Sequence, residues 1–264
     1  MEPTALQHLC LGCMNYLDRP DIPCPACGWQ SNTQNQPHQL VPGSFLAGKY
    51  LIGRALGQGG FGITYIAWDI SQERKVAIKE YYPGDFVTRD RDCYTVSPRT
   101  TQDDVKLFRQ GRDRFSAEAR NLARFSSDPN IVDVLDFFQE NGTAYIVMEF
   151  IEGQTLKQYL TGLGWPMLLG DVLMLLAPVA ESLERVHAAK LLHRDISPDN
   201  IMITDSGAAK LLDFGAARAF SLRHAGVHPG PLAGERHPSA PQRPGAGHQP
   251  RRGGRHPEGH GGGA

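Results

Sequence analysis

The sequence has no long apolar run and no amino-terminal stretch of the kind that directs secretion. Residues 1–9 lack a basic start followed by an apolar segment. The most apolar stretch, Val172–Ala180, contains Pro178 and is far shorter than the roughly 20 residues that a membrane-spanning helix needs. We therefore expect a chain with no membrane segment and a cytoplasmic location.

An excess of charge of either sign is also missing. The chain of 264 residues has 27 Lys and Arg against 28 Asp and Glu, which gives a net charge of −1. Such a balance gives no general attraction to polyanions, so we expect no nucleic-acid partner. The hydrophobic content of 41% suits a globular protein of one medium domain or two small ones.

The last 44 residues lack almost everything that a folded core requires. Their only large apolar side chains are Leu222, Val227 and Leu232, whereas they hold 11 of the 29 Gly, 7 of the 19 Pro and 6 of the 10 His. Burial of so little apolar surface cannot offset the entropy of the chain. We predict that residues 221–264 form a disordered tail.

Cysteine is scarce, and four of the five form two C-x-x-C pairs. The pairs are CLGC (Cys10, Cys13) and CPAC (Cys24, Cys27), ten residues apart. Two such turns supply the four thiolates that a structural zinc ion prefers, in a closed site with no open catalytic position. A disulfide pair or a redox dithiol is the alternative, although disulfides are uncommon inside cells. Cys93 stands alone and reads as an ordinary residue.

The cysteine pairs define a zinc-ribbon-like module at residues 1–30. The residues that follow are polar and contain proline, so we interpret 31–48 as a linker. A module of this size has little core of its own, and its fold is expected to depend on the ion.

From residue 49 the pattern is typical of a phosphate-binding domain. GQGGFG matches G-x-G-x-x-G at Gly57, Gly59 and Gly62, a spacing that dinucleotide-binding folds also use. There the glycines open a helix, whereas here Ile63–Ile66 are β-branched or aromatic, so we predict a hairpin between two strands. Glycines let backbone amides approach phosphates closely, and VAIK then places Lys79 on the next strand, where it can neutralise phosphate charge.

Further elements follow in order downstream. Apolar residues at helical spacing predict a helix over Arg114–Phe125, with Glu118 on one face. The later elements are two strands joined by Asn141–Gly142, a long and largely buried helix over 169–190, HRDISPDN at 193–200, a strand over Ile201–Thr204, a turn at Asp205–Gly207, a strand over 209–213 and DFG at 213–215.

In this order and at these intervals, GQGGFGITY, VAIK, Glu118, HRDISPDN and DFG resemble a protein kinase over about Tyr50–Phe220. With the cysteine pairs ahead of them, they are similar to bacterial serine/threonine kinases of the zinc-ribbon type. The resemblance implies an α+β kinase fold over residues 49–220, with a complete strand-rich amino-terminal lobe and an incomplete helical carboxy-terminal lobe.

The resemblance also implies roles, with ATP and Mg²⁺ as cofactors. Lys79 would contact the α- and β-phosphates and pair with Glu118. Asp195 would accept or orient the proton of the attacking hydroxyl, and Asn200 and Asp213 would hold magnesium. His193 and Phe214 would be packing residues. The nucleotide would lie among Gly57, Gly59, Gly62 and Thr64 at the phosphates and Ala77, Met148, Glu149, Ile151 and Met202 around the adenine.

The implied function is transfer of the γ-phosphate of ATP to a serine or threonine hydroxyl of a protein. Thr64 replaces the usual valine and is nearly isosteric with it. Ser197 stands where most eukaryotic kinases have a lysine that steadies the phosphate. The alternative is a non-catalytic nucleotide-binding module whose zinc ribbon docks a protein partner.

After Phe220 the sequence has no activation segment, no APE-like motif and no helical periodicity. A natural short form, a functional basic tail and a reading-frame shift near Ser221 are the three explanations. The composition rich in Arg, Gly, Pro, Ala and His favours the frame shift. We expect residues 171–190 then to expose an apolar helix face, and the isolated chain to have little or no kinase activity.

Overall fold

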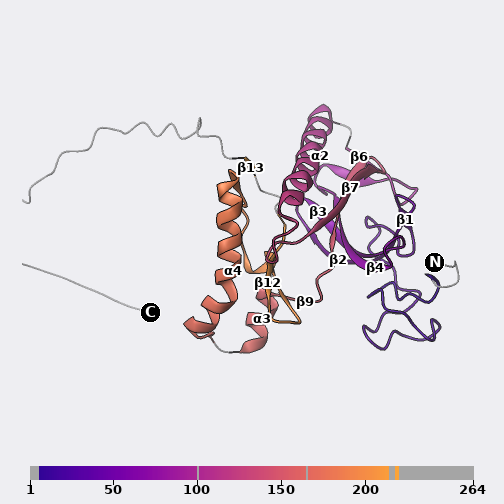
Figure 1. Ribbon diagram of the computed structural model, residues 1–264. Helices are drawn as coiled ribbons and strands as arrows, with labels where there is room; N and C mark the ends of the chain where they lie inside the picture. Colours follow the sequence, from indigo (N-terminus) through magenta and orange to yellow (C-terminus); the bar gives the residue numbers. More distant parts are fainter. Residues whose placement is uncertain (1–5, 100, 165, 214–217, 220–264) are drawn as a thin grey trace, which may run out of the picture. The chain divides into compact units, whose positions relative to one another are not determined.

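The computed structural model describes residues 6–99, 101–164, 166–213 and 218–219 (Figure 1). All of them belong to one contact unit, Met1–Ser221. The predicted tail at 221–264, together with Phe214, lies outside the described residues.

Strands make up most of the first part of the chain, and helices are more frequent in the second. The strands are β1 (Phe45–Leu46), β2 (Tyr50–Gly59), β3 (Gly62–Asp69), β4 (Arg74–Tyr81), β5 (Val87–Arg89), β6 (Val96–Pro98), β7 (Val134–Glu140), β8 (Thr143–Glu149), β9 (Gly153–Thr155), β10 (Leu191–Leu192), β11 (Ile201–Thr204), β12 (Ala209–Leu211) and β13 (Arg218–Ala219). The helices are α2 (Gln102–Leu122), α3 (Leu156–Leu163) and α4 (Leu169–Ala188), with short 3₁₀ turns η1 (Ala123–Phe125) and η2 (Pro198–Asn200).

A six-stranded antiparallel sheet in the order β1-β2-β3-β4-β8-β7 forms the amino-terminal lobe. The predicted glycine-rich hairpin is confirmed, because β2 and β3 pair up to Gly59 opposite Gly62. The predicted turn between β7 and β8 is also confirmed. Asn141 and Gly142 there have φ values of 51° and 76°, which fit the two left-handed positions of a tight hairpin.

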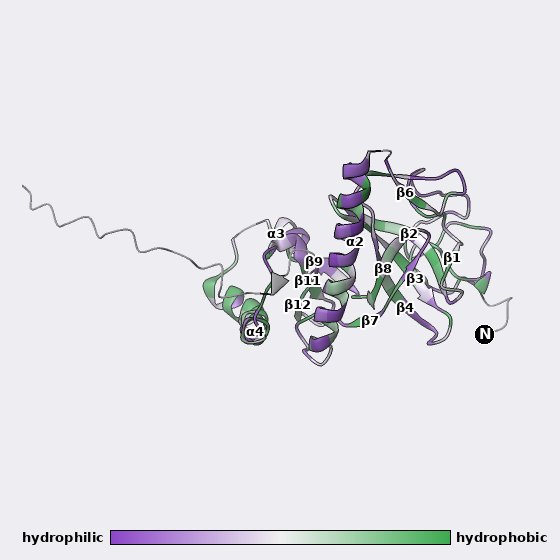
Figure 2. Cartoon of the chain, turned by 90° about the horizontal axis from the view of Figure 1, so that it is seen from above, coloured by the Kyte–Doolittle hydropathy of each residue, from purple (hydrophilic) through white to green (hydrophobic). Residues whose placement is uncertain are grey.

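Helix α2 covers this sheet with a face that includes Phe108, Phe115 and Ala119. The predicted helix over Arg114–Phe125 is therefore longer than expected at its amino-terminal end. Thr101 caps it there by accepting a hydrogen bond from the Asp104 backbone N–H at 3.1 Å. Figure 2 shows the hydrophilic residues along the outer side of α2.

A buried polar network ties the β5–β6 hairpin to the sheet. The side chain of Glu80 is fully buried and accepts hydrogen bonds from Tyr65 and Tyr145 at 2.9 and 3.0 Å. The guanidinium of Arg89, only 1% exposed, pairs with the same carboxylate at 2.6 Å. Burial of an ion pair is tolerated when its remaining oxygen lone pairs are satisfied, as they are here.

The second part of the chain has its own smaller core. Strands β9, β11 and β12 form a three-stranded sheet, and α4 contributes Val179 and Val186 to the apolar cluster beside it. The prediction that α4 is largely buried is wrong, because its other face has no partner among the described residues. Figure 2 shows hydrophobic residues along α4, and the most exposed in and just before it are Leu168, Leu169, Leu173 and Met174. This exposed face agrees with the expectation for an incomplete helical lobe.

The residues ahead of the sheet pack against it. Leu9 and Met14 share an apolar cluster with Ile66 and Trp68 of β3. Leu40, in the segment interpreted as a linker, is completely buried in the main core. None of the helices in the described part of the chain is both long and apolar enough to cross a bilayer.

Candidate active site

The glycine-rich hairpin leaves open space where a ligand could approach the backbone. A Cβ atom added at Gly57 or Gly59 would meet no atom within 4 Å. At Gly62 it would lie 2.4 Å from the backbone oxygen of Glu80, so only glycine allows β3 to pass β4 this closely. The hairpin thus has an accessible backbone at Gly57 and Gly59, while Gly62 packs tightly against β4.

Lys79 lies on β4 directly opposite Thr64 of β3, as the sequence predicts for a lysine beside the glycine-rich hairpin. Its ammonium group forms an ion pair with the carboxylate of Asp213, which follows β12. The resemblance implied a pair with Glu118 instead. Within the described residues, the one ion pair of Lys79 is to Asp213.

Glu118 lies on α2 and is 5% exposed. Burial raises the pKa of its carboxyl group, the positive charge of Lys79 lowers it, and the neighbouring Asp213 raises it again. The net result is a pKa of about 7. Lys79, Glu118 and Asp213 therefore form one electrostatic cluster, in which burial and the neighbouring Asp213 favour the protonated form of Glu118 and Lys79 favours the charged form.

Asp195 and Asn200 lie together in the HRDISPDN segment. The Asn200 side-chain NH₂ donates to the Asp195 carboxylate at 3.0 Å and to its backbone oxygen at 2.9 Å. Asp195 itself is exposed. The structure thus places a solvent-accessible carboxylate beside an amide whose nitrogen holds it in position.

Buried His193 joins this segment to the end of β12. Its Nε2–H donates to the backbone oxygen of Leu212 at 2.9 Å, and its Nδ1 accepts from the backbone N–H of Asp195 at 3.3 Å. Burial lowers the pKa of His193, which favours this neutral form. The histidine therefore fixes Asp195 relative to the chain that leads to Asp213.

Two residues of the site have strained backbones. Arg194 has a φ of 66° and Asp213 a φ of 51°. Left-handed conformations of non-glycine residues cost on the order of 1–3 kcal/mol each and are concentrated at functional sites. Arg194 directly precedes Asp195, and Asp213 is the second of the two carboxylates that the sequence singled out.

Four of the five residues expected around the adenine come from three strands, and the fifth, Ile151, lies between β8 and β9. Ala77 of β4 and Met148 of β8 are direct cross-strand partners, and Met202 lies on β11. Glu149 ends β8, and its carboxylate accepts hydrogen bonds from Lys210 at 2.5 Å and from the Asp133 backbone N–H at 2.9 Å.

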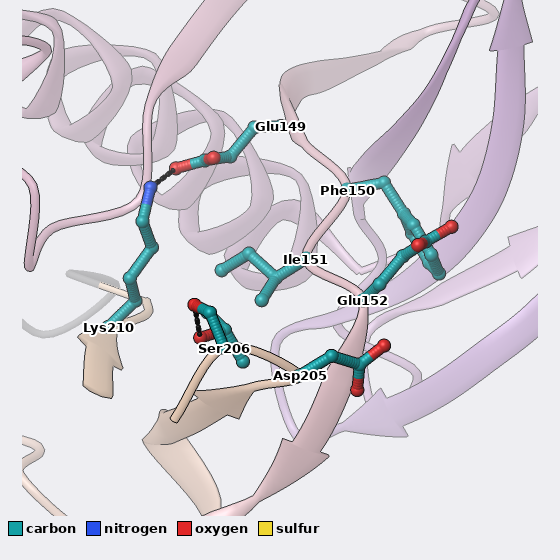
Figure 3. Close-up of a pocket in the computed structure, with 8 residues that line it drawn as sticks. Glu149, Phe150, Ile151, Glu152, Asp205, Ser206 and Lys210 are labelled. Atoms are coloured by element: carbon teal, nitrogen blue, oxygen red, sulfur yellow. Dashed lines mark hydrogen bonds and ion pairs between the residues drawn. The ribbon is translucent and has the colours of Figure 1, made fainter. Parts of the chain in front are cut away.

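A cavity of about 390 Å³ lies at the segment 149–152 (Figure 3). It shares Glu149 and Ile151 with the expected adenine set and extends to the turn between β11 and β12 and to Lys210. It does not include Lys79, Asp195 or Asp213, so it is not the phosphate-handling part of the site. Sequence reasoning did not identify Lys210, whose pairing with Glu149 joins residues 61 positions apart.

The four cysteines of the two C-x-x-C pairs come together. Their sulfur atoms all lie within 4.8 Å of one another, with Cys10–Cys27 at 3.5 Å and Cys13–Cys24 at 3.8 Å. Zinc–sulfur bonds of about 2.3 Å in a tetrahedron require sulfur separations of roughly 3.8 Å, so the donor set fits that ion. Burial raises the pKa of the Cys10 thiol, and the Gly12 backbone N–H, which donates to Cys10 Sγ at 3.3 Å, lowers it by a smaller amount.

Comparison with known proteins points to one family. The family described as protein kinase domain matches residues 50–230. The serine/threonine-protein kinase PrkC of Bacillus subtilis is 34% identical over 69% of this chain, and the serine/threonine-protein kinase pkn2 of Myxococcus xanthus is 36% identical over 68%. These alignments span only 25% and 19% of the two relatives. A solved structure described as the apo form of PpkA-294 is 40% identical, with a TM-score of 0.62 over 67% of this chain and 62% of that one.

Proposed function

Because the chain belongs to the protein kinase family, we propose that it binds ATP with Mg²⁺ and transfers the γ-phosphate to a serine or threonine hydroxyl of a protein. The observation that carries the proposal is the convergence of Lys79, Glu118 and Asp213 beside the glycine-rich hairpin, with Asp195 and Asn200 fixed to the same region through His193.

Phosphoryl transfer needs positioning and neutralisation of charge more than covalent help from the protein. Lys79 supplies the positive charge for the phosphates, and the open backbone at Gly57 and Gly59 lets amide groups approach them. The exposed Asp195 carboxylate accepts the proton of the incoming hydroxyl. The hydrogen bond from Asn200 keeps that carboxylate oriented while the hydroxyl binds.

Asn200 and Asp213 fit a magnesium ion. In the described part of the chain, Asn200 uses its side-chain nitrogen to hold Asp195, which leaves its Oδ1 oxygen as a ligand. Asp213 offers a carboxylate, and oxygen atoms are the donors that Mg²⁺ prefers. The bound ion would neutralise charge on the phosphates. The Lys79–Asp213 ion pair keeps the cation proposed for the phosphates and the carboxylate proposed for the ion next to each other.

Cys10, Cys13, Cys24 and Cys27 hold a structural zinc ion in this proposal. The support is the four-sulfur cluster with tetrahedral separations. Burial would raise the pKa of Cys24, but hydrogen bonds from the backbone at Cys27 and Ala26 and from the neighbouring thiols lower it, whereas burial raises the pKa of Cys10 and Cys13. The charge of a bound ion would offset that cost of burial and keep all four sulfur atoms as thiolates. A four-thiolate site needs a reducing compartment, and we propose a cytoplasmic location accordingly.

Nucleotide binding and phosphate transfer by the full chain test the kinase proposal. We expect saturable binding of a fluorescent ATP analogue with Mg²⁺. We expect only a low level of phosphate transfer to a generic protein substrate, in keeping with the little or no activity expected of an incomplete helical lobe. Lys79→Met is expected to weaken binding at least tenfold, and Asp195→Asn to abolish transfer while leaving binding intact. The exposed residues of α2 provide matched controls in Lys106→Met and Asp113→Asn.

Each result decides between functions. Binding without transfer in the wild-type chain would favour the non-catalytic nucleotide-binding module. Absence of both would contradict the kinase proposal. If phosphate transfer persisted in Asp195→Asn, Asp195 would not be the group that accepts the proton of the incoming hydroxyl.

A further inference from the structure

Strand β2 has a bulge just ahead of the glycine-rich turn, and residues outside the sheet fill it. Pairing with β3 is irregular between Ile52 and Ala55. The Arg54 backbone N–H donates to the Leu11 oxygen at 2.8 Å, and the Ala55 N–H donates to Asn35 Oδ1 at 3.0 Å. Bulges leave backbone groups unpaired within a sheet, and here the amino-terminal residues satisfy them.

Asn35 makes a two-sided contact with this bulge. Besides accepting from Ala55, it donates from Nδ2 to the Gly53 oxygen at 3.2 Å and to the Leu40 oxygen at 2.8 Å. One amide therefore bridges both sides of Arg54. Because β2 continues directly into Gly57 and Gly59, this contact fixes the strand that carries the glycine-rich turn.

The cysteine cluster approaches the same bulge so closely that β2 needs a glycine there. A Cβ atom at Gly53 would lie 2.3 Å from the Leu11 oxygen and 2.5 Å from Met14 Cε. Leu11 lies within the Cys10–Cys13 turn, which is closed by the Met14 N–H donating to the Cys10 oxygen at 2.7 Å. The position of the Leu11 carbonyl is thus set by the turn that carries two sulfur ligands.

The linker also contacts the glycine-rich turn itself. Gln58, between Gly57 and Gly59, accepts hydrogen bonds at its Oε1 atom from His38 Nε2 at 2.7 Å and from Gln39 Nε2 at 3.1 Å. These contacts join residues about 20 positions apart. The linker therefore restrains the position of the glycine-rich turn through the Gln58 side chain.

A third contact reaches the segment beside the expected adenine position. Phe150 packs with Leu9, Met14 and Trp68 in the apolar cluster between the cysteine module and the sheet. Figure 3 shows Phe150 and its neighbour Ile151 pointing to opposite sides of their segment. Packing of Phe150 on the module therefore fixes the segment from which Ile151 projects.

We propose that the cysteine module and its linker position the nucleotide site, with Asn35 as a positioning residue for the glycine-rich strand, so that metal occupancy of the four cysteines sets nucleotide affinity. The inference rests on the proposed ATP binding and the proposed zinc site. Loss of the ion loosens the Cys10–Cys13 turn and withdraws the Leu11 carbonyl from Arg54. Loss of the Asn35 amide releases the same bulge from its other side.

The first test compares three variants of the full chain. Asn35→Ala is expected to raise the Kd for a fluorescent ATP analogue about tenfold, the scale of one or two hydrogen bonds. Asn32→Ala, at an exposed linker position, is expected to leave the Kd unchanged. Ser182→Ala, on α4, removes a buried hydrogen bond to Asp128 of the loop after η1. It controls for a general loss of stability, and no change in Kd is expected.

The second test uses the metal and has a readout independent of nucleotide. We expect one zinc per chain by colorimetric release, and faster amide hydrogen exchange at Arg54 and Ala55 after chelation or in Cys13→Ser. Exchange within α4 should remain unchanged. Gly53→Ala, which forces Leu11 away from β2, should reproduce the faster exchange, whereas Gly170→Ala, in open space at α4, should not.

The outcomes separate this inference from the kinase proposal. Failure of the wild-type chain to bind nucleotide overturns the proposed function and this inference with it. Nucleotide binding that is equally tight in wild type, Asn35→Ala and the chelated protein overturns this inference alone. An equal loss of affinity in Ser182→Ala and Asn35→Ala also overturns it, because the effect would then be one of general stability.

Discussion

The sheet of residues 45–149 and the helical part from 156 to 213 differ in how completely their apolar side chains are buried and their buried polar groups are paired. In the sheet, the buried carboxylate of Glu80 has three partners, and α2 covers the apolar face. In the helical part, α4 buries one face and exposes Leu169, Leu173 and Met174. The half that carries the glycine-rich hairpin thus has its apolar faces covered by α2 and by the residues ahead of the sheet, whereas the half that carries Asp195 leaves an apolar helix face in solvent.

Because the two halves are packed differently, destabilising the protein should affect the functions of their residues to different degrees. A property that depends on the sheet, such as the placing of Lys79, is supported by a cooperative core and a buried polar network. A property that depends on Asp195 relies on an exposed segment held by His193 and Asn200. Nucleotide binding should therefore be more robust than phosphate transfer.

The largest effect is expected from Arg89→Leu. The substitution leaves the fully buried charge of Glu80 without its cation, which costs about 3–5 kcal/mol in the free energy of unfolding. Urea denaturation of the variant measures this cost, with Arg91→Leu at an exposed position of the same β5–β6 hairpin as the control. Loss of under 1 kcal/mol would mean that the sheet does not depend on this network.

Next in size are two cavity-forming substitutions, one in each half. Ile78→Ala in the sheet and Leu211→Ala on β12 both remove fully buried side chains and should cost about 2–5 kcal/mol. Because α4 packs on one side only, Leu211→Ala should lie lower in that range. If urea denaturation showed that Leu211→Ala loses as much unfolding free energy as Ile78→Ala, or more, the two halves would not differ in packing as described.

A smaller effect, dependent on pH, is expected at Asp128. Burial would raise the pKa of Asp128, but hydrogen bonds from Ser182, Asn130 and Arg185 outweigh burial and lower it. A carboxyl group with a lowered pKa stabilises the fold above its unfolded pKa of about 4, and this contribution is lost as the pH falls through the folded value.

Asp128→Asn tests this linkage. The variant should be about 1–2 kcal/mol less stable than wild type near neutral pH, because it loses the hydrogen bonds to a charged acceptor. The difference should shrink as the pH falls below about 4. Asp113→Asn, at an exposed position of α2, should cause neither a loss of stability at neutral pH nor a change in its pH dependence. A difference that grows toward acid pH would contradict the assigned direction of the pKa shift.

The smallest effect on folding should come from Leu173→Gln on the exposed face of α4. Leu173 is 57% exposed, so the change in unfolding free energy should stay within about 0.5 kcal/mol. Self-association in sedimentation velocity should nevertheless decrease, because the apolar patch becomes smaller. Glu184→Gln, at an exposed position of the same helix, serves as the control. If Leu173→Gln left self-association unchanged, this face of α4 would not be the surface through which the chains associate.

Local patterns made much of the fold predictable. The hairpin at Gly59–Gly62, the strand that carries Lys79 and the turn at Asn141–Gly142 depend on residues close in sequence, and all three were predicted. The clustering of the four cysteines followed from their spacing in the same way. The roles implied for the site residues remain predictions that nucleotide and transfer measurements must test.

Contacts between distant residues escaped prediction because no local pattern encodes them. The partner of Lys79 lies 134 positions away at Asp213, and that of Glu149 lies 61 positions away at Lys210. Asn35 looked like an ordinary polar linker residue, since nothing near it in sequence marks the β2 bulge that it fills. The burial of α4 was overestimated because apolar periodicity identifies a face without showing what covers it.

The contacts of the linker also matter for the practical choice of where to cut this protein for expression. Sequence motifs alone would start a recombinant fragment near residue 49. Such a fragment would lose Asn35 and Leu11 from the β2 bulge and uncover Leu51, Ile66 and Trp68 to water. The shortest piece that retains the proposed nucleotide and zinc sites intact should therefore begin ahead of the first cysteine pair, and purification buffers should contain zinc and no strong chelator.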